Sequence, residues 1–333
     1  MISVVVPAYN AAQTISKCVG ALTQQSIPRD KYEIIVVDDG STDETAAVAE
    51  AAGAQAICQS NHGPAAARNR GVAAARGDLI LFTDADCEPA PDWIAEMVWP
   101  FSDSVVVGVK GAYRTHQWKA VSRLVQCEFE ERYDRLERLP FIDFVDTYSA
   151  AFRASALRQV GGFDPAFPHA NNEDVDFSYR LARQGCRLVF NRRALVYHHH
   201  ADRWLAYLRL KIKRGYWRLV VYRLHPGKAL RDSYTPQLLK VQIVLVLLCA
   251  GWAVMVLIWP VLWWGVAASF FGLGLSTVPF TRLVLRRDPK LAVLAPLFIA
   301  GRAVAFAVGV LGGLVGMLFF RSALSAPEAS ASD

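Results

Sequence analysis

Cysteine is scarce in this sequence, and its spacing fits neither a metal-binding module nor a disulfide framework. The six cysteines are spread through 333 residues, with no CxxC pair and no histidine at zinc-finger spacing. This pattern argues against such modules and favours reduced thiols in a cytosolic compartment. The start of the chain also lacks a basic segment followed by an apolar one, because residues 2–6 already have the composition of a β-strand. We therefore expect no secretory signal there and an amino-terminal domain that stays in the cytosol.

Polar residues become rare in the last third of the sequence. Asp, Glu, Asn and Gly are frequent up to Asp202, whereas residues 238–320 consist mainly of Val, Leu, Ala, Trp and Phe. The runs 241–259 and 261–285 each have the length needed to cross a hydrocarbon core of about 30 Å. Two buried helices of a soluble core are the alternative. Residues 303–320 can cross a third time, with Arg302 extending to the cytosolic interface.

The net charge of +6 does not by itself indicate a nucleic-acid partner. Lys and Arg are concentrated between Arg203 and Arg231, directly before the apolar runs, so the expected partner is an anionic membrane surface. Residues 203–224 mix apolar and basic side chains, which is consistent with a helix lying on the bilayer, although a solvated linker helix is the simpler alternative. The predicted parts are a soluble domain (1–202), a basic interfacial linker helix (203–237), a transmembrane region of two to three helices (238–320) and a polar tail (321–333).

The second apolar run ends in further basic residues, at positions 282 to 290, which belong to the loop after it. By the positive-inside rule they place this loop and the soluble domain on the cytosolic side of the membrane. We therefore expect a multi-pass protein of the cell inner membrane or another membrane, with its soluble domain in the cytosol.

The soluble part alternates strands with helices. Apolar runs of strand length are each followed by turn residues and a segment of helical spacing; the predicted strands are 2–6, 33–37, 55–59 and 79–83. This alternation predicts an α/β fold with a buried, mainly parallel sheet flanked by helices. Ligands of such sheets bind where loops leave the carboxyl ends of the strands. The expected ligand-binding loops are 7–10, 38–41 and 84–86.

Two helix starts are predicted from capping residues. Pro7 is expected to end the first strand, and Asn10 to cap the helix that follows it. Ser41 with Glu44 three positions later has the pattern of a capping box and predicts that the next helix opens there. Gly53 is expected to stop that helix.

Asp84 and Asp86 flank one small residue at the end of a predicted strand. Such carboxylates can meet a hard divalent cation whose remaining ligands are diphosphate oxygens and water. The ion would neutralise a leaving nucleotide diphosphate. Alone, the pattern is weak, because a solvated loop pair or a turn also explains it.

Six ordered segments give these aspartates a context: VVVPAYNA, VVDDGSTD, GPAAARNRG, GDLILFTDAD, VGGFD and NEDVDFSYRLARQG. Together they resemble family 2 glycosyltransferases of the GT-A fold over residues 2–200. Several are common singly, but all six in this order and spacing are specific. The resemblance implies a Rossmann-like GT-A sheet and transfer of a sugar, with inversion, from a nucleotide-diphosphate donor to an acceptor hydroxyl.

The resemblance also implies where the nucleotide binds. Pro7, Ala8, Tyr9 and Asp39 would receive the base, since a carboxylate can accept a hydrogen bond from a base N–H. The alternative for Asp38 and Asp39 is capping of the following helix, a role that Ser41 is already expected to fill, and we favour Asp39 over Asp38 as the donor ligand.

Four further residues complete the site that the resemblance implies. Arg68 would face the nucleotide, with a surface salt bridge as the alternative. Asp84 would lie beside the ribose and Asp86 would be the main metal ligand, and all-oxygen ligation suits Mg²⁺ or Mn²⁺. His198 matches the metal-binding histidine of some members; an exposed turn without metal is the alternative. Side chains alternate along a strand, so at most His198 and His200 can face one ion.

Asp174 is the predicted catalytic base. Glu173 and Asp174 match the ED motif of the family at the start of a helix, where backbone N–H groups favour an ionised carboxylate. An acceptor hydroxyl needs such a group to take its proton. The alternative is that both acids only stabilise the helix dipole. Asp176 and Arg180 are explained by an ordinary ion pair within the helix.

These features predict a metal-dependent hexosyl or related transfer to a lipid-linked or saccharide acceptor at the membrane, in glycan or cell-envelope polysaccharide assembly. A processive polysaccharide synthase is an alternative, but the QxxRW motif of such relatives is missing and the comparable segment reads KIKRGYW. A non-catalytic, membrane-tethered nucleotide-sugar binding or scaffold protein is the alternative from another class. The sequence departs from the family pattern at His62 and Ser149, where donor or acceptor preference is expected to differ.

Overall fold

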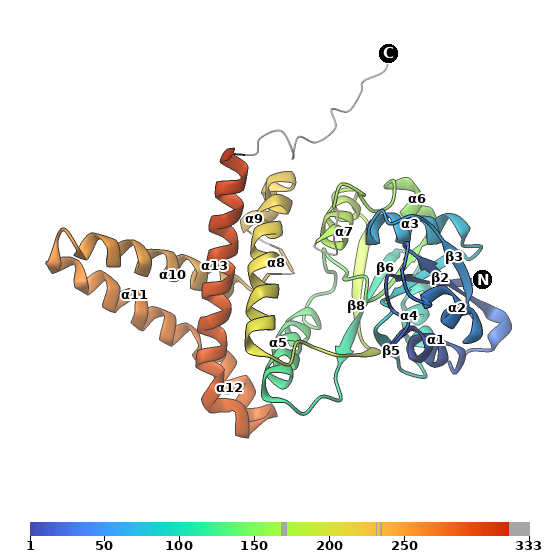
Figure 1. Ribbon diagram of the computed structural model, residues 1–333, viewed down its shortest axis with the longest axis horizontal. Helices are drawn as coiled ribbons and strands as arrows, with labels where there is room; N and C mark the ends of the chain where they lie inside the picture. The colour runs from blue at the N-terminus through green and yellow to red at the C-terminus, as the bar shows by residue number, and fades with distance from the viewer. Residues whose placement is uncertain (168–171, 231, 234, 320–333) are drawn as a thin grey trace, which may run out of the picture. The chain divides into compact units, whose positions relative to one another are not determined.

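The computed structural model describes residues 1–167, 172–230, 232–233 and 235–319 (Figure 1). The chain divides into two compact units. The first comprises residues 1–203 with 232–235, and the second comprises residues 204–231 with 236–333. The predicted polar tail, 321–333, lies outside the described residues.

The first unit is built on one eight-stranded sheet with the order β3-β2-β1-β4-β7-β6-β8-β5. Its strands are β1 (Ile2–Ala8), β2 (Tyr32–Asp38), β3 (Gln55–Cys58), β4 (Leu79–Thr83), β5 (Cys87–Pro89), β6 (Val106–Arg114), β7 (Ser149–Arg153) and β8 (Arg187–His198). The first four pair in parallel, as do β6 and β8, whereas β7 and β5 run antiparallel to their neighbours. The predicted mixed, mainly parallel sheet is confirmed.

Helices cover both faces of this sheet. In Figure 1, α3 (Pro64–Ala74), α6 (Ala154–Gln159) and α7 (Glu173–Arg183) lie on one side, and α1 (Ile15–Thr23), α2 (Thr45–Ala51) and α4 (Trp93–Val98) lie on the other. The unit also contains α5 (Ala120–Leu136). Phe82, Phe152, Phe163 and Phe177 pack together in the core, with ring centroids 4.5 to 6.2 Å apart. Aromatic pairs of this kind stabilise the core of this unit.

Two predictions about the first loop are wrong. Pro7 does not end β1 but lies within it, opposite Val37 of β2. A proline is tolerated there because β4 pairs with β1 only as far as Val5, so no partner on that side needs its missing N–H. Asn10 does not cap α1, which begins at Ile15. Instead Asn10 has a φ of 50° and joins the neighbouring loop, its N–H donating to Ser41 Oγ at 2.9 Å.

The predicted capping box is also wrong. The Ser41 hydroxyl donates to Asp38, and α2 begins only at Thr45, with no side-chain cap from Glu44. Gly40, at a φ of 75°, turns the chain directly after β2, and the turn brings Ser41 back to the strand end. Gly53, at a φ of 101°, follows α2 as predicted.

The second unit is helical. Its helices are α8 (Trp204–Leu224), α9 (Pro226–Leu230), α10 (Gln237–Val256), α11 (Trp263–Ser276), α12 (Val278–Arg287) and α13 (Ala295–Phe319). Within this unit α8 and α13 run side by side, and α10 and α11 form a hairpin (Figure 1). Among the described residues, three helical segments are long and apolar enough to cross a membrane: 237–256, 260–287 and 289–316. These helices indicate membrane association.

The third apolar segment differs from its prediction. Its helix begins at Ala295, not at residue 303, so Arg302 lies inside it. The predicted extension of Arg302 to an interface is wrong, because the side chain is 3 % exposed and its Nη2 donates to Gln242 Oε1 of α10 at 3.1 Å. The hydrogen bond to Gln242 offsets part of the cost of burying the charged Arg302 side chain between the helices.

Candidate active site

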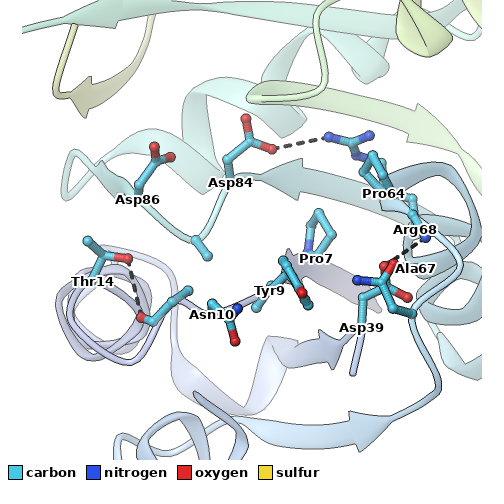
Figure 2. A pocket seen from close by; sticks show the side chains of 15 residues that line it. Pro7, Tyr9, Asn10, Thr14, Asp39, Pro64, Ala67, Arg68, Asp84 and Asp86 are labelled. Atoms are coloured by element: carbon cyan, nitrogen blue, oxygen red, sulfur yellow. Dashed lines mark hydrogen bonds and ion pairs between the residues drawn. The ribbon is translucent and has the colours of Figure 1, made fainter. Parts of the chain in front are cut away.

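A cavity of about 700 Å³ opens at the carboxyl ends of β1, β2 and β4 (Figure 2). The parallel register sets Ala8 level with Asp38, so the loops that follow these strands lie beside each other. The cavity is lined by residues of these loops, of the start of α3 and of the turn between β4 and β5: Pro7, Ala8, Tyr9, Asn10, Ala11, Thr14, Asp39, Asn61, Gly63, Pro64, Ala67, Arg68, Asp84, Ala85 and Asp86. Every predicted donor-binding residue and the predicted metal ligand Asp86 therefore line the same cavity.

Asp39 organises one wall of the cavity. Its Oδ1 accepts hydrogen bonds from Gln59 Nε2 at 2.7 Å and from the His62 N–H at 3.0 Å, and its Oδ2 accepts from the Gly63 N–H at 2.8 Å. Gly63, at a φ of 88°, lets the loop curl around the carboxylate. Asp38 is occupied by Ser41 instead and does not appear among the lining residues. His62, where the sequence departs from the family pattern, therefore lies next to Asp39.

Arg68 joins two distant parts of the sequence. Its Nη1 donates to Glu173 Oε1 at 2.7 Å and its Nη2 to Asp84 Oδ1 at 3.2 Å. Burial opposes the charge, but Glu173, Asp84 and Asp174 outweigh it and raise the pKa of Arg68. The surface salt bridge considered as an alternative is wrong, because the guanidinium is buried. Arg68 therefore places a permanent positive charge in the lining of the cavity.

Asp84 and Asp86 differ in their surroundings (Figure 2). Burial and the neighbouring Asp86 raise the pKa of Asp84, and the ion pair with Arg68 opposes that rise. Burial also acts on Asp86, but its contact with His198 prevails and lowers the pKa of Asp86. Asp86 is therefore the more firmly ionised of the two and the better ligand for a cation.

The antiparallel pairing of β5 with β8 brings the predicted metal ligands together. His198 Nδ1 lies 3.5 Å from Asp86 Oδ2. This nitrogen is buried and, apart from its ion pair with Asp86, makes no hydrogen bond within the described part of the chain. Tyr113 stacks on the imidazole at 4.7 Å and fixes its plane. His200 is used elsewhere, because its Nε2 contacts Gln126 Oε1 at 3.0 Å.

One potential ligand was missed by sequence reasoning. Cys87 stands opposite His198 in the β5–β8 pairing, and the ligand atoms of Asp86, Cys87 and His198 all lie within 4.8 Å of one another. A single cysteine after the two aspartates has no motif of its own, so only the strand pairing reveals it. Burial raises the pKa of the Cys18 and Cys87 thiols, which are both neutral.

Asp174 lies in the first turn of α7, next to Glu173. Its Oδ1 accepts a hydrogen bond from the Val175 N–H at 2.8 Å. Burial, followed by the charges of Glu173 and Asp146, raises the pKa of Asp174 to about 7. The predicted effect of the helix-start N–H groups is present, because the hydrogen bond from the Val175 N–H lowers the pKa of Asp174, but burial and the two carboxylates outweigh it. A carboxylate with a pKa near neutrality suits a general base.

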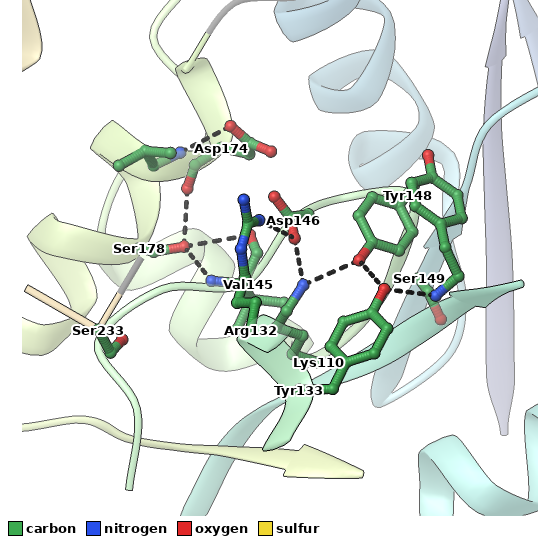
Figure 3. Close-up of polar contacts among 12 residues, drawn as sticks. Lys110, Arg132, Tyr133, Val145, Asp146, Tyr148, Ser149, Asp174, Ser178 and Ser233 are labelled. Atoms are coloured by element: carbon green, nitrogen blue, oxygen red, sulfur yellow. Dashed lines mark hydrogen bonds and ion pairs between the residues drawn. The ribbon is translucent and has the colours of Figure 1, made fainter. Parts of the chain in front are cut away.

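A buried polar network lies beside Asp174 (Figure 3). Lys110 of β6 contacts the Asp146 carboxylate, and its Nζ donates to Tyr148 Oη at 3.1 Å. Tyr148 Oη lies 3.0 Å from Tyr133 Oη. Burial lowers the pKa of Lys110, against the opposing effect of Asp146. Sequence reasoning missed this network, because an isolated lysine within an apolar segment carries no motif.

Ser178 links this network to the predicted base (Figure 3). Its hydroxyl donates to the Asp174 carbonyl oxygen at 2.7 Å and accepts from the Val145 N–H at 3.0 Å. The start of α7 is thus tied to the loop that carries Asp146. Ser149, where a departure was expected to affect preference, is instead buried in packing: it accepts from Trp93 Nε1 at 2.9 Å and donates to the Ala194 carbonyl oxygen at 3.2 Å.

Two family profiles match the chain. Residues 3–161 match the profile described as Glycosyl transferase family 2. Residues 109–311, more than half of the chain, match the profile described as Glycosyl transferase family group 2. The two matches together include both the cavity and most of the helical unit.

Curated relatives carry glycosyltransferase names. The glycosyltransferase AglE of Haloferax volcanii is 37 % identical over an alignment of 205 residues that covers 57 % of this chain and 64 % of that protein. The pre-mycofactocin glycosyltransferase of Mycobacterium tuberculosis is 30 % identical over an alignment of 221 residues that covers 62 % of this chain and 44 % of that protein. The match therefore spans less than two thirds of either relative.

The fold also has a solved counterpart. The mannosyltransferase PcManGT from Pyrobaculum calidifontis, solved in complex with GDP-Man and Mn²⁺, matches with a TM-score of 0.61 and 22 % sequence identity. The match covers 94 % of this chain and 86 % of that one. At this identity the likeness concerns the fold.

Proposed function

The chain belongs to glycosyltransferase family 2, and from this premise we propose that it transfers a hexosyl or related sugar, with inversion, from a nucleotide-diphosphate donor to an acceptor hydroxyl. The observation that carries the proposal is a single cavity lined by Asp39, Arg68, Asp84 and Asp86. Arg68 also contacts Glu173, the neighbour of Asp174. The cavity and Arg68 therefore connect the residues that we assign to donor binding, to ion binding and to proton removal.

The donor nucleoside is assigned to the end of β1 and the loop after β2. Tyr9 is 52 % exposed and offers an aromatic face to a base, with Pro7 and Ala8 beside it. Asp39 keeps its carboxylate fixed by the backbone N–H groups of the 59–63 loop, so it can accept from a base N–H without moving. Asp84 then lies nearer the ribose and the diphosphate. GDP-Man in the mannosyltransferase of similar fold is consistent with a donor of this class.

Asp86 and His198 are assigned to a divalent cation, Mg²⁺ or Mn²⁺. Their donor atoms face each other at 3.5 Å, and the buried His198 Nδ1 makes no hydrogen bond within the described residues, so both fit an ion between them. When bound, the ion supplies positive charge to the leaving diphosphate. Arg68 adds a second positive charge to the lining of the same cavity.

Asp174 is assigned as the base. Its carboxylate takes the proton of the acceptor hydroxyl while the hydroxyl oxygen forms a bond to the anomeric carbon and the bond from that carbon to the diphosphate oxygen breaks. The ion pair between Arg68 and Glu173 holds the first turn of α7 toward the cavity. Ser178, one turn later in α7, bonds both the Asp174 carbonyl oxygen and the Val145 N–H and so ties this helix start to the neighbouring loop.

The acceptor is assigned to the membrane. Three helical segments meet the length and composition needed to cross a bilayer. Anchoring raises the frequency with which the cavity meets a lipid-linked or membrane-located saccharide. We assign the catalytic unit to the cytosolic side, in contact with membrane lipids, and the reaction to assembly of a glycan or cell-envelope polysaccharide.

Donor hydrolysis and sugar transfer by the purified full-length protein test the proposal. Nucleotide sugars are first screened by thermal shift, and the best donor is assayed with Mn²⁺ or Mg²⁺. Asp86→Ala and Asp174→Asn should each lower the rate by about 10²- to 10⁴-fold. Asp30→Asn, a change at a surface acid, should keep the wild-type rate. Wild-type rates in both site variants would defeat the assignment and favour a binding or scaffold protein.

A further inference from the structure

Cys87 belongs to the same cluster as Asp86 and His198, but the proposed function gives it no role. Its side chain is fully buried. Its thiol donates a hydrogen bond to Asp86 Oδ1 at 3.7 Å, and the ligand atoms of the three residues all lie within 4.8 Å of one another. The sulfur is therefore close enough to two predicted metal ligands to share an ion with them.

The strand pairing explains why these residues meet. β5 begins directly after Asp86, and its antiparallel register sets Cys87 opposite His198. Residues directly opposite each other on neighbouring strands project from the same face of the sheet. Tyr113, at the end of β6, stacks on His198 and holds the ring in place. The thiol and the imidazole are thus fixed by backbone structure, and Asp86 is fixed by the turn that precedes β5.

The distances suit a small tetrahedral ion. With metal–ligand bonds of about 2.0 to 2.3 Å, neighbouring ligand atoms in a tetrahedral site stand about 3.3 to 3.8 Å apart. The separation from Asp86 Oδ2 to His198 Nδ1 is 3.5 Å, and that from the other oxygen, Asp86 Oδ1, to Cys87 Sγ is 3.7 Å. One oxygen, the sulfur and the nitrogen all lie within 4.8 Å of one another, so rotation of the Asp86 carboxylate and small side-chain movements would bring them to tetrahedral spacing.

We propose that Asp86, Cys87 and His198 form a mixed oxygen, sulfur and nitrogen site that binds thiophilic divalent ions such as Zn²⁺, Co²⁺ or Cd²⁺ in preference to Mg²⁺. When the ion binds, the Cys87 thiol releases its proton to solvent and the sulfur forms a bond to the metal. Sulfur and imidazole ligands favour these ions, whereas Mg²⁺ favours oxygen. Three protein ligands leave a fourth position for water or a diphosphate oxygen. The proposal rests on the proposed function for the roles of Asp86 and His198 and adds the class of ion.

Cobalt absorption tests the proposal without any turnover. The full-length protein in detergent is freed of metal with a chelator and titrated with Co²⁺ in the absence of donor. Cys58→Ala is the background for every variant, because Cys58 is exposed and would bind cobalt on its own. We expect a thiolate-to-cobalt charge-transfer band that saturates at one ion per chain.

Two variants identify the sulfur. Cys87→Ser should abolish the charge-transfer band and weaken Zn²⁺ binding by more than about tenfold, while Mg²⁺ binding changes less than about twofold. Cys18→Ala is the matched control, because Cys18 is equally buried and its Sγ faces the Asp84 carbonyl oxygen at 3.5 Å. This control should keep the band. Circular dichroism shows whether each variant is folded, and Cys87→Ala replaces Cys87→Ser if the serine variant is not.

The outcomes separate this proposal from the proposed function. A cobalt spectrum without charge transfer, or a band that survives loss of the Cys87 thiol, would overturn the role of sulfur. Mn²⁺ binding, measured by electron paramagnetic resonance, then tests whether Asp86 and His198 bind a metal without the thiol. Equal Mn²⁺ binding by the wild type and Cys87→Ser would leave the site of Asp86 and His198 intact. No Mn²⁺ binding by the wild type would also remove the metal from the proposed function.

Discussion

The guanidinium of Arg68 and the carboxylate of Glu173 form a buried ion pair, with Nη1 and Oε1 2.7 Å apart and side chains 4 % and 3 % exposed. Arg68 stands on α3, whose first turns line the cavity, and Glu173 opens α7, which carries Asp174. Because Arg68 also contacts Asp84, a single side chain connects the predicted ribose neighbour to the helix of the predicted base.

Arg68→Ala should lower both stability and transfer. Removing one member of a buried ion pair leaves an uncompensated charge and costs about 3–5 kcal/mol in the free energy of unfolding. Chemical denaturation of the detergent-solubilised protein measures this loss. Lys31→Ala is the control, because Lys31 pairs with Asp30 and both side chains are largely exposed, so it should cost about 1 kcal/mol or less. Equal losses in the two variants would contradict a buried role for Arg68.

The rate of sugar transfer should increase as the pH is raised through about 7. Burial and the charges of Glu173 and Asp146 raise the pKa of Asp174 to about 7, so the carboxylate is protonated below that pH and cannot accept a proton from the acceptor. The value of kcat/KM should therefore fall about tenfold per pH unit on the acid side. A pH–rate profile from pH 5 to 9 checks this, and a kcat/KM that stays level down to pH 5 would contradict it.

Asp146→Asn should shift this acid limb to lower pH. The substitution removes a negative charge that raises the pKa of Asp174, so the base stays ionised in more acidic solution. A merely structural role of Asp146 would lower the rate at every pH without moving the limb. The comparison of the two pH–rate profiles therefore separates the two roles.

Lys110→Met should destabilise the fold strongly. The lysine is fully buried against Asp146, and its removal leaves that carboxylate with only the more distant cation Arg132, whose Nη1 lies 4.0 Å from Asp146 Oδ2, so the cost is at most about 3–5 kcal/mol. The double variant Lys110→Met with Asp146→Asn should recover a large part of this loss, since neither buried charge remains. Denaturation of all four proteins gives the coupling energy. Additive losses would show that the two residues do not act as a pair.

The part of the site that could be predicted from the sequence is the part that local patterns specify. Apolar runs followed by short acidic or glycine-containing loops gave β1, β2 and β4 with Asp39, Asp84 and Asp86 at their ends. These loops converge because parallel strands end at one edge of a sheet. Their position in the cavity followed from strand direction alone, without knowledge of distant contacts.

The other half of the site depends on contacts between distant segments. Lys110 is buried only because Asp146 and Tyr148, from a later segment, surround its amino group. Cys87 meets His198 only through the pairing of β5 with β8. The pKa of Asp174 is set by burial and by two neighbouring carboxylates, which outweigh the hydrogen bond from the helix-start N–H group. Only that N–H group could be predicted from the sequence. Tertiary surroundings of this kind leave no periodic signal in the chain.

Close contact between α8 and α13 predicts that Gly309→Ala destabilises the helical unit. A Cβ at Gly309 would lie 2.1 Å from the Ile212 carbonyl oxygen of α8, so the two backbones would have to separate. Overpacking of this kind costs about 1–3 kcal/mol. Gly312→Ala is the matched control, because a Cβ there meets no atom within 4 Å. Thermal unfolding of both variants in detergent measures the difference. Since alanine is the better helix former, the control should be neutral or slightly stabilising, and a similar gain at Gly309 would mean that the helices do not pack this closely.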